Sequence, residues 1–139
     1  MPHPIPRLRV LVVDDSVDNA DALCAVLAAM GCETAVAYGG SQGLAAAPGF
    51  DPDLAFIDLE MPGLGGCDAA RQLCAARPRG KARLICLTGR SQPLDRRNCI
   101  DAGFDDFFTK PIAPESLARL VAAASVAILA GLSIPPCRP

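Results

Sequence analysis

Strand-like runs and helix-like stretches alternate from one end of this chain to the other, and this alternation restricts the folds open to it. The strand-like runs are rich in apolar residues and lie at 7–13, 33–38, 54–59, 83–87 and 104–109. Helix-like stretches follow each run, over about 20–30, 41–47, 67–76, 94–102 and 115–129, and the fourth of these is polar. Short connections between such units imply a parallel sheet with helices on both faces. We therefore predict an α/β fold with a doubly wound five-stranded parallel sheet in the order 2-1-3-4-5.

Several residues predict where these elements begin and end. Ser16 or Asp18 is expected to cap the first helix at its N-terminus, and Gly31 is expected to end it. Pro48 is expected to stop the second helix, because proline has no N–H and its ring crowds the preceding turn. Pro114 opens the last helix, at a position that proline favours.

Length and composition fit a single domain. The chain has 139 residues, of which 51% are hydrophobic, and this is enough for a full core. No repeat or linker divides it, so we expect one domain over 1–139, with its core at about 8–130 and tails at 1–6 and 133–139. The net charge of −2 argues against general binding to nucleic acid, which needs clustered Lys and Arg.

Seven cysteines could indicate disulfides or a zinc site, but their positions favour neither. They are scattered without a CxxC pair, and the only histidine, His3, lies in a proline-rich start. We interpret them as reduced thiols, mostly in the core, of a cytoplasmic protein. The start lacks the apolar segment of a signal peptide, and the apolar stretch 120–132 is too short to cross a bilayer. Nothing in the sequence therefore points to a membrane or to export.

Charged side chains stand at the ends of three strand-like runs. Asp14 and Asp15 follow the first run, Asp58 ends the third and Lys110 follows the fifth. The carboxyl ends of parallel strands open on one edge of a sheet, so these groups are expected to converge in an acidic pocket. Such oxygen ligands suit Mg²⁺, with one carboxylate free to act as a nucleophile. A turn or helix-capping role is the alternative for Asp14 or Asp15 taken singly.

Four short motifs, each at an expected strand end, resemble the receiver domain of two-component response regulators over about 8–129. They are Asp14-Asp15, Asp58 followed by Met61-Pro62-Gly63, Thr88-Gly89 and Lys110-Pro111. Each motif alone is common, but their order and placement together are specific to this family. The resemblance implies a flavodoxin-like receiver fold and a phosphorylation-dependent signalling switch rather than an enzyme.

The resemblance also implies roles for these residues. Asp58 would accept a phosphoryl group from a phosphohistidine on a sensor histidine kinase or a histidine phosphotransfer protein. Asp14 and Asp15, with Asp58 and the backbone carbonyl of Glu60, would hold Mg²⁺, which offsets the repulsion between a carboxylate and an incoming phosphoryl group. Lys110 would pair with the acceptor or with phosphate oxygens. A general base is unnecessary, because a carboxylate is already anionic at neutral pH.

A conformational switch is expected beside the acceptor. The Thr88 hydroxyl would donate to a phosphate oxygen and move inward, leaving space that the Phe107 ring enters. A plain strand end is the alternative for Thr88, and a plain core ring for Phe107, while Phe108 should face the other side of the sheet. Glu60 and Arg90 lie at expected rim positions, where they would tune the lifetime of the acyl phosphate. The Glu60 side chain could instead bind the metal directly.

The last helix carries more apolar residues than one buried face needs, because Val126, Ala127 and Leu129 widen its stripe. In this family the fourth helix, the fifth strand and the last helix mediate homodimers or effector contacts, so we expect a partner surface here. An Ala-rich end folded against the tail is the alternative.

The wider context of the chain admits two interpretations. Segments 87–90, 95–97 and 102–105 resemble receivers attached to hybrid histidine kinases, whereas an initiating Met1 favours a stand-alone regulator, which we expect.

Other functions fit the motifs less well. A pseudo-receiver that acts as a protein-interaction module is the main alternative. A phosphatase of the haloacid dehalogenase type would need an Asp-x-Asp signature, where this chain has Asp14-Asp15-Ser16, and a cap or a longer chain. A flavodoxin-like cofactor binder would need a phosphate-cradling loop after the first strand, and none is found there.

Overall fold

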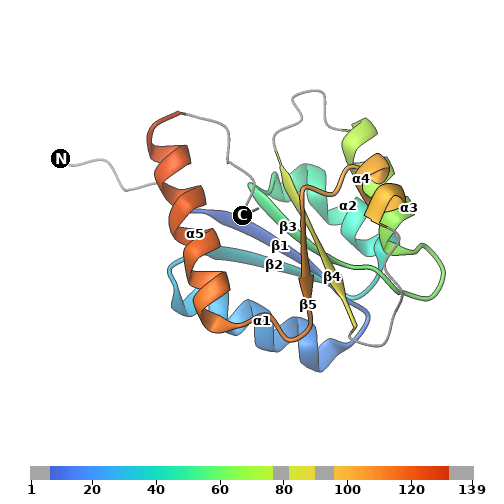
Figure 1. The fold of residues 1–139 in the computed structure, drawn as a ribbon, viewed down its shortest axis with the longest axis horizontal. Coiled ribbons are helices and arrows are strands. Elements are labelled where there is room, and N and C mark those ends of the chain that lie inside the picture. The colour runs from blue at the N-terminus through green and yellow to red at the C-terminus, as the bar shows by residue number, and fades with distance from the viewer. Residues whose placement is uncertain (1–6, 77–81, 90–95, 132–139) are drawn as a thin grey trace.

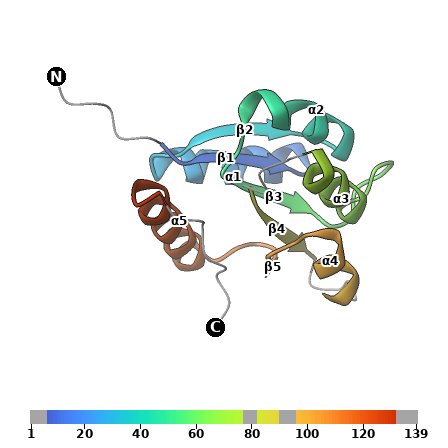
Figure 2. The same cartoon turned by 90° about the horizontal axis from the view of Figure 1, so that it is seen from above.

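The computed structural model describes residues 7–76, 82–89 and 96–131. In this part of the chain five strands form one parallel sheet in the order β2-β1-β3-β4-β5 (Figures 1 and 2). The strands are β1 (Arg9–Val13), β2 (Glu33–Ala37), β3 (Leu54–Asp58), β4 (Arg83–Thr88) and β5 (Asp106–Thr109). The predicted fold class and strand order are confirmed.

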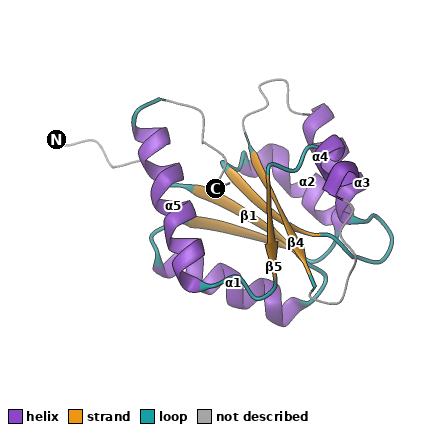
Figure 3. Cartoon of the chain, viewed as in Figure 1, coloured by secondary structure: helices purple, strands orange, loops and turns teal. Residues whose placement is uncertain are grey.

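The described helices connect the strands and cover both faces of the sheet (Figure 3). They are α1 (Val17–Ala29), α2 (Gly40–Phe50), α3 (Gly66–Ala76), α4 (Arg96–Ala102) and α5 (Pro114–Leu129). The buried side chains divide into two clusters, one shared by α1 and α5 and the other by α2, α3 and α4. The molecule is thus a three-layer arrangement of helices, sheet and helices.

The first helix begins and ends as predicted. Ser16 is its N-cap, and the Ser16 hydroxyl accepts a hydrogen bond from the backbone N–H of Asn19 at 3.4 Å. Gly31 follows the helix with φ of +92°, a conformation that glycine adopts without strain. Elsewhere β5 begins at Asp106 rather than at 104, and α4 begins at Arg96, while 94 and 95 lie outside the described residues.

The prediction that Pro48 stops the second helix is wrong. α2 continues past Pro48 to Phe50, and Asp51 then ends it in the left-handed conformation. Pro48 lies in the last turn, so its missing N–H removes only the helical hydrogen bond to the Leu44 carbonyl. Phe50 packs against the core, and the Arg9 Nε donates to the Phe50 carbonyl at 2.7 Å. These tertiary contacts hold the last turn in place.

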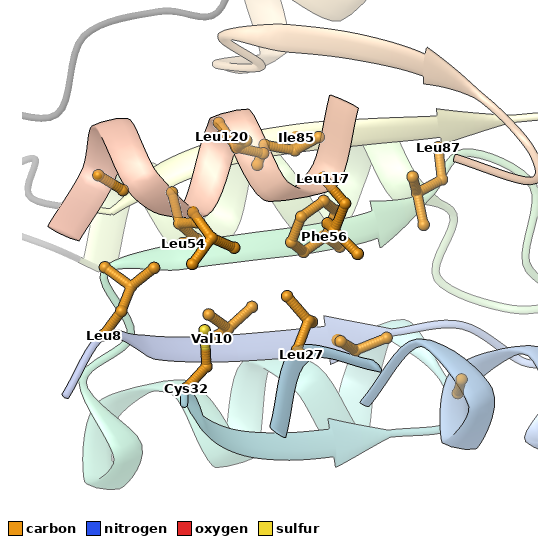
Figure 4. Packing of buried hydrophobic residues seen from close by; sticks show 14 of the residues in the cluster. Leu8, Val10, Leu27, Cys32, Leu54, Phe56, Ile85, Leu87, Leu117 and Leu120 are labelled. Atoms are coloured by element: carbon orange, nitrogen blue, oxygen red, sulfur yellow. The ribbon is translucent and has the colours of Figure 1, made fainter. Parts of the chain in front are cut away.

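Both faces of the sheet are buried, because side chains alternate along each strand. On the α1 and α5 face, Val10, Leu54 and Phe56 pack with Leu117 and Leu120 (Figure 4). The cluster on the other face includes Leu11, Val13, Ile57, Leu84 and Cys86 from the strands. Burying one side chain of the Val or Leu type contributes about 1.5–3 kcal/mol to the stability of the fold. Because both faces of the sheet are buried, inward- and outward-pointing strand residues are alike apolar.

All strand pairs are parallel, so the carboxyl ends of β1, β3, β4 and β5 meet at one edge of the sheet. Among the described residues, no helix combines the length and the apolar character that a membrane crossing requires. The single-domain boundaries at 1–139 stay a prediction, because 1–6 and 132–139 lie outside the described residues.

Candidate functional site

Three aspartates meet at the carboxyl edge of the sheet, as the sequence predicted. Asp14 and Asp15 directly follow β1, and Asp58 is the last residue of β3. One carboxylate oxygen of each lies within 4.8 Å of the others. Asp14 and Asp58 are only 2% and 4% exposed, whereas Asp15 is exposed. The pocket thus combines two buried carboxylates with one that solvent reaches.

Asp14 is held in place by hydrogen bonds to three other residues. Its Oδ1 accepts a hydrogen bond from the backbone N–H of Ser16 at 2.9 Å, and its own N–H donates to the Ala37 carbonyl at 3.1 Å. Its Oδ2 accepts a hydrogen bond from the Lys110 ammonium at 3.0 Å. Both carboxylate oxygens therefore have partners, and β2 and β5 help to fix the group.

Lys110 brings the fifth strand into the site. It directly follows β5, its N–H donates to the Thr88 carbonyl at 2.8 Å, and the peptide bond to Pro111 is cis. Its Nζ lies 3.0 Å from Asp14 Oδ2 and 3.2 Å from Asp58 Oδ1. Burial acts to lower the pKa of Lys110, but the hydrogen bonds and charges of Asp14 and Asp58 outweigh it and raise that pKa. Lys110 is therefore a firmly protonated bridge between two buried carboxylates.

The environment of Asp58 changes the pKa of its carboxyl group. Burial raises its pKa, Lys110 opposes this and Asp14 adds to it, with the result that the pKa rises to about 6 from its ordinary 3.8. One ammonium thus pairs with two of the three clustered carboxylates, and the pocket keeps an excess of negative charge. Clustered hard oxygen donors with uncompensated charge fit a divalent cation of the Mg²⁺ kind.

A family model described as the response regulator receiver domain matches residues 10–122, which is most of this chain. The chain belongs to the response regulator receiver domains. Over 117 residues it is 37% identical to the DNA-binding response regulator MtrA of Mycobacterium tuberculosis, and the match covers 84% of this chain and 50% of MtrA. Over 123 residues it is 34% identical to the protein PilH of Pseudomonas aeruginosa, covering 88% of this chain and 98% of PilH. This receiver therefore spans about half the length of MtrA and nearly all of PilH.

Solved structures share the fold of this receiver. A CheY-like receiver domain protein of Methanospirillum hungatei aligns with a TM-score of 0.79 at 25% identity, over 91% of this chain and 99% of that one. The receiver domain of Ssk1 of Saccharomyces cerevisiae, crystallised with the histidine phosphotransfer protein Ypd1, aligns with a TM-score of 0.78 at 23% identity, over 91% and 94% of the two chains. The second likeness concerns the fold alone.

The residues expected to form the receiver's switch lie on β4 and β5, the two strands next to β3 on one side of the sheet. Thr88 ends β4 and is 6% exposed. Phe107 packs on the α2–α4 face and Phe108 on the α1 and α5 face, so the two rings point to opposite sides of β5 as predicted. The Arg96 guanidinium lies 5.2 Å from the centre of the Phe107 ring. Phe107 is only half-buried, and its contact with Arg96 comes from the first residue of α4.

Of the two residues expected at the rim of the pocket, the structure describes only Glu60. Glu60 is exposed in the loop after β3, outside the group of three carboxylates. Arg90 lies outside the described residues.

Gly66 is a site residue that the sequence analysis missed. A Cβ at Gly66 would lie 2.4 Å from the Asp58 carbonyl and 2.8 Å from the Leu59 Cα. The Gly66 N–H donates to the Leu59 carbonyl at 3.0 Å, which closes the loop after β3. The only signal in the sequence is the pair Gly65-Gly66 in that turn, where close approach of two backbones requires glycine.

A groove of about 470 Å³ opens beside the pocket and was also not predicted. It runs between α1 and the segment that follows β5, from Asp14 and Lys110 at one end towards Val26 and Leu117. Its other lining residues are Asn19, Ala22, Leu23, Pro111, Ile112 and Pro114. The acidic pocket is therefore continuous with a largely apolar channel on the surface.

Proposed function

We propose that this receiver domain accepts a phosphoryl group on Asp58 from a phosphohistidine and acts as a phosphorylation-dependent switch. The observation that carries the proposal is the pairing of buried Asp58 with Lys110, 3.2 Å away, next to two further aspartates. The carboxylate oxygen of Asp58 attacks phosphorus, the bond from phosphorus to the histidine nitrogen breaks, and the imidazole keeps the electron pair. The Lys110 ammonium remains as partner for the negative charge that collects on the phosphoryl oxygens.

Asp14, Asp15 and Asp58, with the backbone carbonyl of Glu60, are the residues that would hold Mg²⁺. When bound there, Mg²⁺ neutralises charge between the acceptor and the phosphoryl group. Asp14 is oriented for this role by the Ser16 N–H, and Asp15 is the ligand that remains open to solvent.

The donor is a sensor histidine kinase or a histidine phosphotransfer protein, a partner of the class with which the Ssk1 receiver was crystallised. A histidine that reaches Asp58 must be presented over the pocket, so its protein must cover the surface around the pocket. The groove along α1 offers apolar contacts from Leu23, Val26 and Ile112 at that place. We assign this groove to the donor.

Phosphorylation shifts the population between two packings of Thr88 and Phe107. The output passes to the surface formed by α4, β5 and α5, where it reaches a second copy or an effector. Ile100 on α4 is 47% exposed, and Val126 and Leu129 on α5 are 66% and 62% exposed, which supports a partner there.

Two further assignments complete the proposal. Hydrolysis of the acyl phosphate by the receiver itself resets the switch, with Glu60 and Arg90 as residues that tune the rate. No disulfide links the described cysteines, which supports a cytoplasmic location.

The test is intact mass after incubation with acetyl phosphate and Mg²⁺. Wild type should gain one phosphoryl group, EDTA should prevent the gain, and Asp58→Ala should gain none. If wild type gains none under conditions that label a control receiver, the chain is a pseudo-receiver whose function lies on its surfaces.

A further inference from the structure

Three cysteines that are far apart in the sequence meet on the α2–α4 face of the sheet. Cys67 lies in the first turn of α3, Cys86 in β4 and Cys99 in α4. The sulfurs of Cys67 and Cys99 are 3.6 Å apart, and the Asn98 Nδ2 lies 3.7 Å from the Cys67 sulfur. Cys86 belongs to the same packed cluster as Cys67 and Cys99. Burial raises the pKa of Cys86, and the nearby Cys99 and Cys67 raise it further. The α3 and α4 helices lie side by side in Figures 1 and 2.

The sulfurs of Cys67 and Cys99 are close enough for a small movement to bring them into bonding distance. Sulfurs in a disulfide are about 2.0 Å apart, so the two atoms need to approach by about 1.5 Å. Cys67 is half-buried and within reach of a small oxidant, whereas Cys99 is 1% exposed. Among the described residues only the three aspartates have the spacing of a three-ligand metal site, so the sulfurs are better placed for a disulfide than for a metal.

We propose that Cys67 and Cys99 are a redox pair that forms a reversible disulfide under hydroperoxide. The Cys67 thiolate attacks the peroxide oxygen, which gives a sulfenic acid and hydroxide, and the hydroxide takes up the proton that Cys67 lost. The Cys99 thiol then attacks the Cys67 sulfur, and the sulfenic oxygen leaves as water with the Cys99 proton. The two thiols lose two electrons and the peroxide becomes two waters. A dithiol reverses the step by exchange.

The reaction is slow at neutral pH. Burial, with the neighbouring Cys99 as the next cause, raises the pKa of Cys67 to about 11. Only the thiolate reacts, so the pair responds to sustained oxidant rather than to a brief pulse.

The disulfide would join α3 to α4 next to the proposed switch. Gly66, the neighbour of Cys67, packs on the Asp58 carbonyl, and Arg96 in α4 lies over the Phe107 ring. Cys86 pairs with Phe107 across β4 and β5. The link therefore holds α4 against α3 where Phe107 would move, and it should slow the labelling of Asp58. This consequence rests on the proposed function, whereas the disulfide itself does not.

The test is oxidation of the reduced receiver with hydrogen peroxide, followed by blocking of free thiols, intact mass and peptide mapping. Wild type should lose two hydrogens and two reactive thiols, map to Cys67 linked to Cys99, and revert with dithiothreitol. Cys67→Ser should abolish the link, and Cys99→Ala should do the same if circular dichroism shows it folded. Cys24→Ser, on the other face of the sheet, should keep the link.

Three other outcomes would contradict the proposed disulfide between Cys67 and Cys99. They are an unchanged mass, a disulfide through other cysteines, or a sulfinic acid at Cys67 with a free thiol at Cys99. Labelling with acetyl phosphate then separates the two claims. If oxidation slows the labelling of Asp58 in wild type but not in Cys67→Ser, the disulfide affects the phosphorylation site as proposed. Equal labelling rates in the oxidised and reduced forms would contradict this effect but not the disulfide itself. Failure to label in either form overturns the proposed function and leaves the disulfide map intact.

Discussion

The Lys110 ammonium lies 3.2 Å from Oδ1 of Asp58, and this ion pair joins the end of β5 to the end of β3 across the pocket. The same ammonium contacts Asp14 at 3.0 Å, so one cation keeps two buried carboxylates together. Hydrogen bonds to charged groups of this kind contribute about 1.5–3 kcal/mol. The pair is therefore large enough to influence both the stability and the chemistry of the site.

Lys110→Ala should slow phosphoryl labelling of Asp58 by about tenfold or more, because the charge that pairs with the phosphoryl oxygens is lost. The rate is followed by intact mass with acetyl phosphate and Mg²⁺. Arg119→Ala removes a positive charge from an exposed position on α5 and should label at the wild-type rate. Equal rates for Lys110→Ala and Arg119→Ala would show that Lys110 has no part in the transfer.

Asp58→Asn should stabilise the metal-free protein at neutral pH. The pKa of Asp58 is about 6 in the folded protein and 3.8 ordinarily, so the folded state binds more protons between these values. Stability from this group is present below about pH 4 and is lost as pH rises through about 6. A difference of about two pKa units corresponds to a gain on the order of 3 kcal/mol for Asn above pH 6.

Urea unfolding in EDTA at a series of pH values measures this difference. The curves of wild type and Asp58→Asn should converge towards about pH 4. The control is Asp68→Asn, at an exposed position of α3, which should match wild type throughout. A constant gap between Asp58→Asn and wild type at every pH would contradict the role of the buried charge.

Asp15→Asn should weaken the binding of Mg²⁺ by about tenfold or more, because the site loses its solvent-facing carboxylate. Mg²⁺ stabilises the fold through mass action, so thermal unfolding measured at rising Mg²⁺ concentration reports the affinity. Asp18→Asn, also exposed but outside the group of three, should respond like wild type. An unchanged Mg²⁺ response in Asp15→Asn would remove Asp15 from the site.

Gly66→Ala should destabilise the protein by about 1–3 kcal/mol, because the new Cβ would collide with the backbone of Asp58 and Leu59. Gly49→Ala is a matched control inside α2, where a Cβ meets no atom within 4 Å. That control should be neutral or stabilise by up to about 1 kcal/mol. Urea unfolding of both variants decides whether the close approach at Gly66 matters.

The sequence predicted the parts of this structure that depend on local pattern. Apolar runs bounded by charged residues located the strand ends, and parallel pairing then required Asp14, Asp58 and Lys110 to converge. Ser16 was one of two predicted caps for α1, the other being Asp18, and the contact between Ser16 and Asn19 that decides between them spans one helical turn.

Features that depend on tertiary packing were missed. Pro48 was expected to stop α2, but the contact between Arg9 and Phe50 keeps the helix for one more turn. The approach of Cys67 to Cys99 follows from the packing of α3 on α4, which no local spacing reveals. The groove along α1 likewise arises only when the segment after β5 is placed beside that helix.

The most direct test of the proposed switch is to find which residue carries the phosphoryl group. Borohydride reduces an aspartyl phosphate to homoserine, and peptide mass mapping of the labelled receiver then locates the converted residue. We predict homoserine at position 58 alone, formed only after labelling in the presence of Mg²⁺. Conversion at Asp14 or Asp15 with Asp58 intact, or a phosphoryl group that resists borohydride, would contradict the assignment of Asp58 as the acceptor.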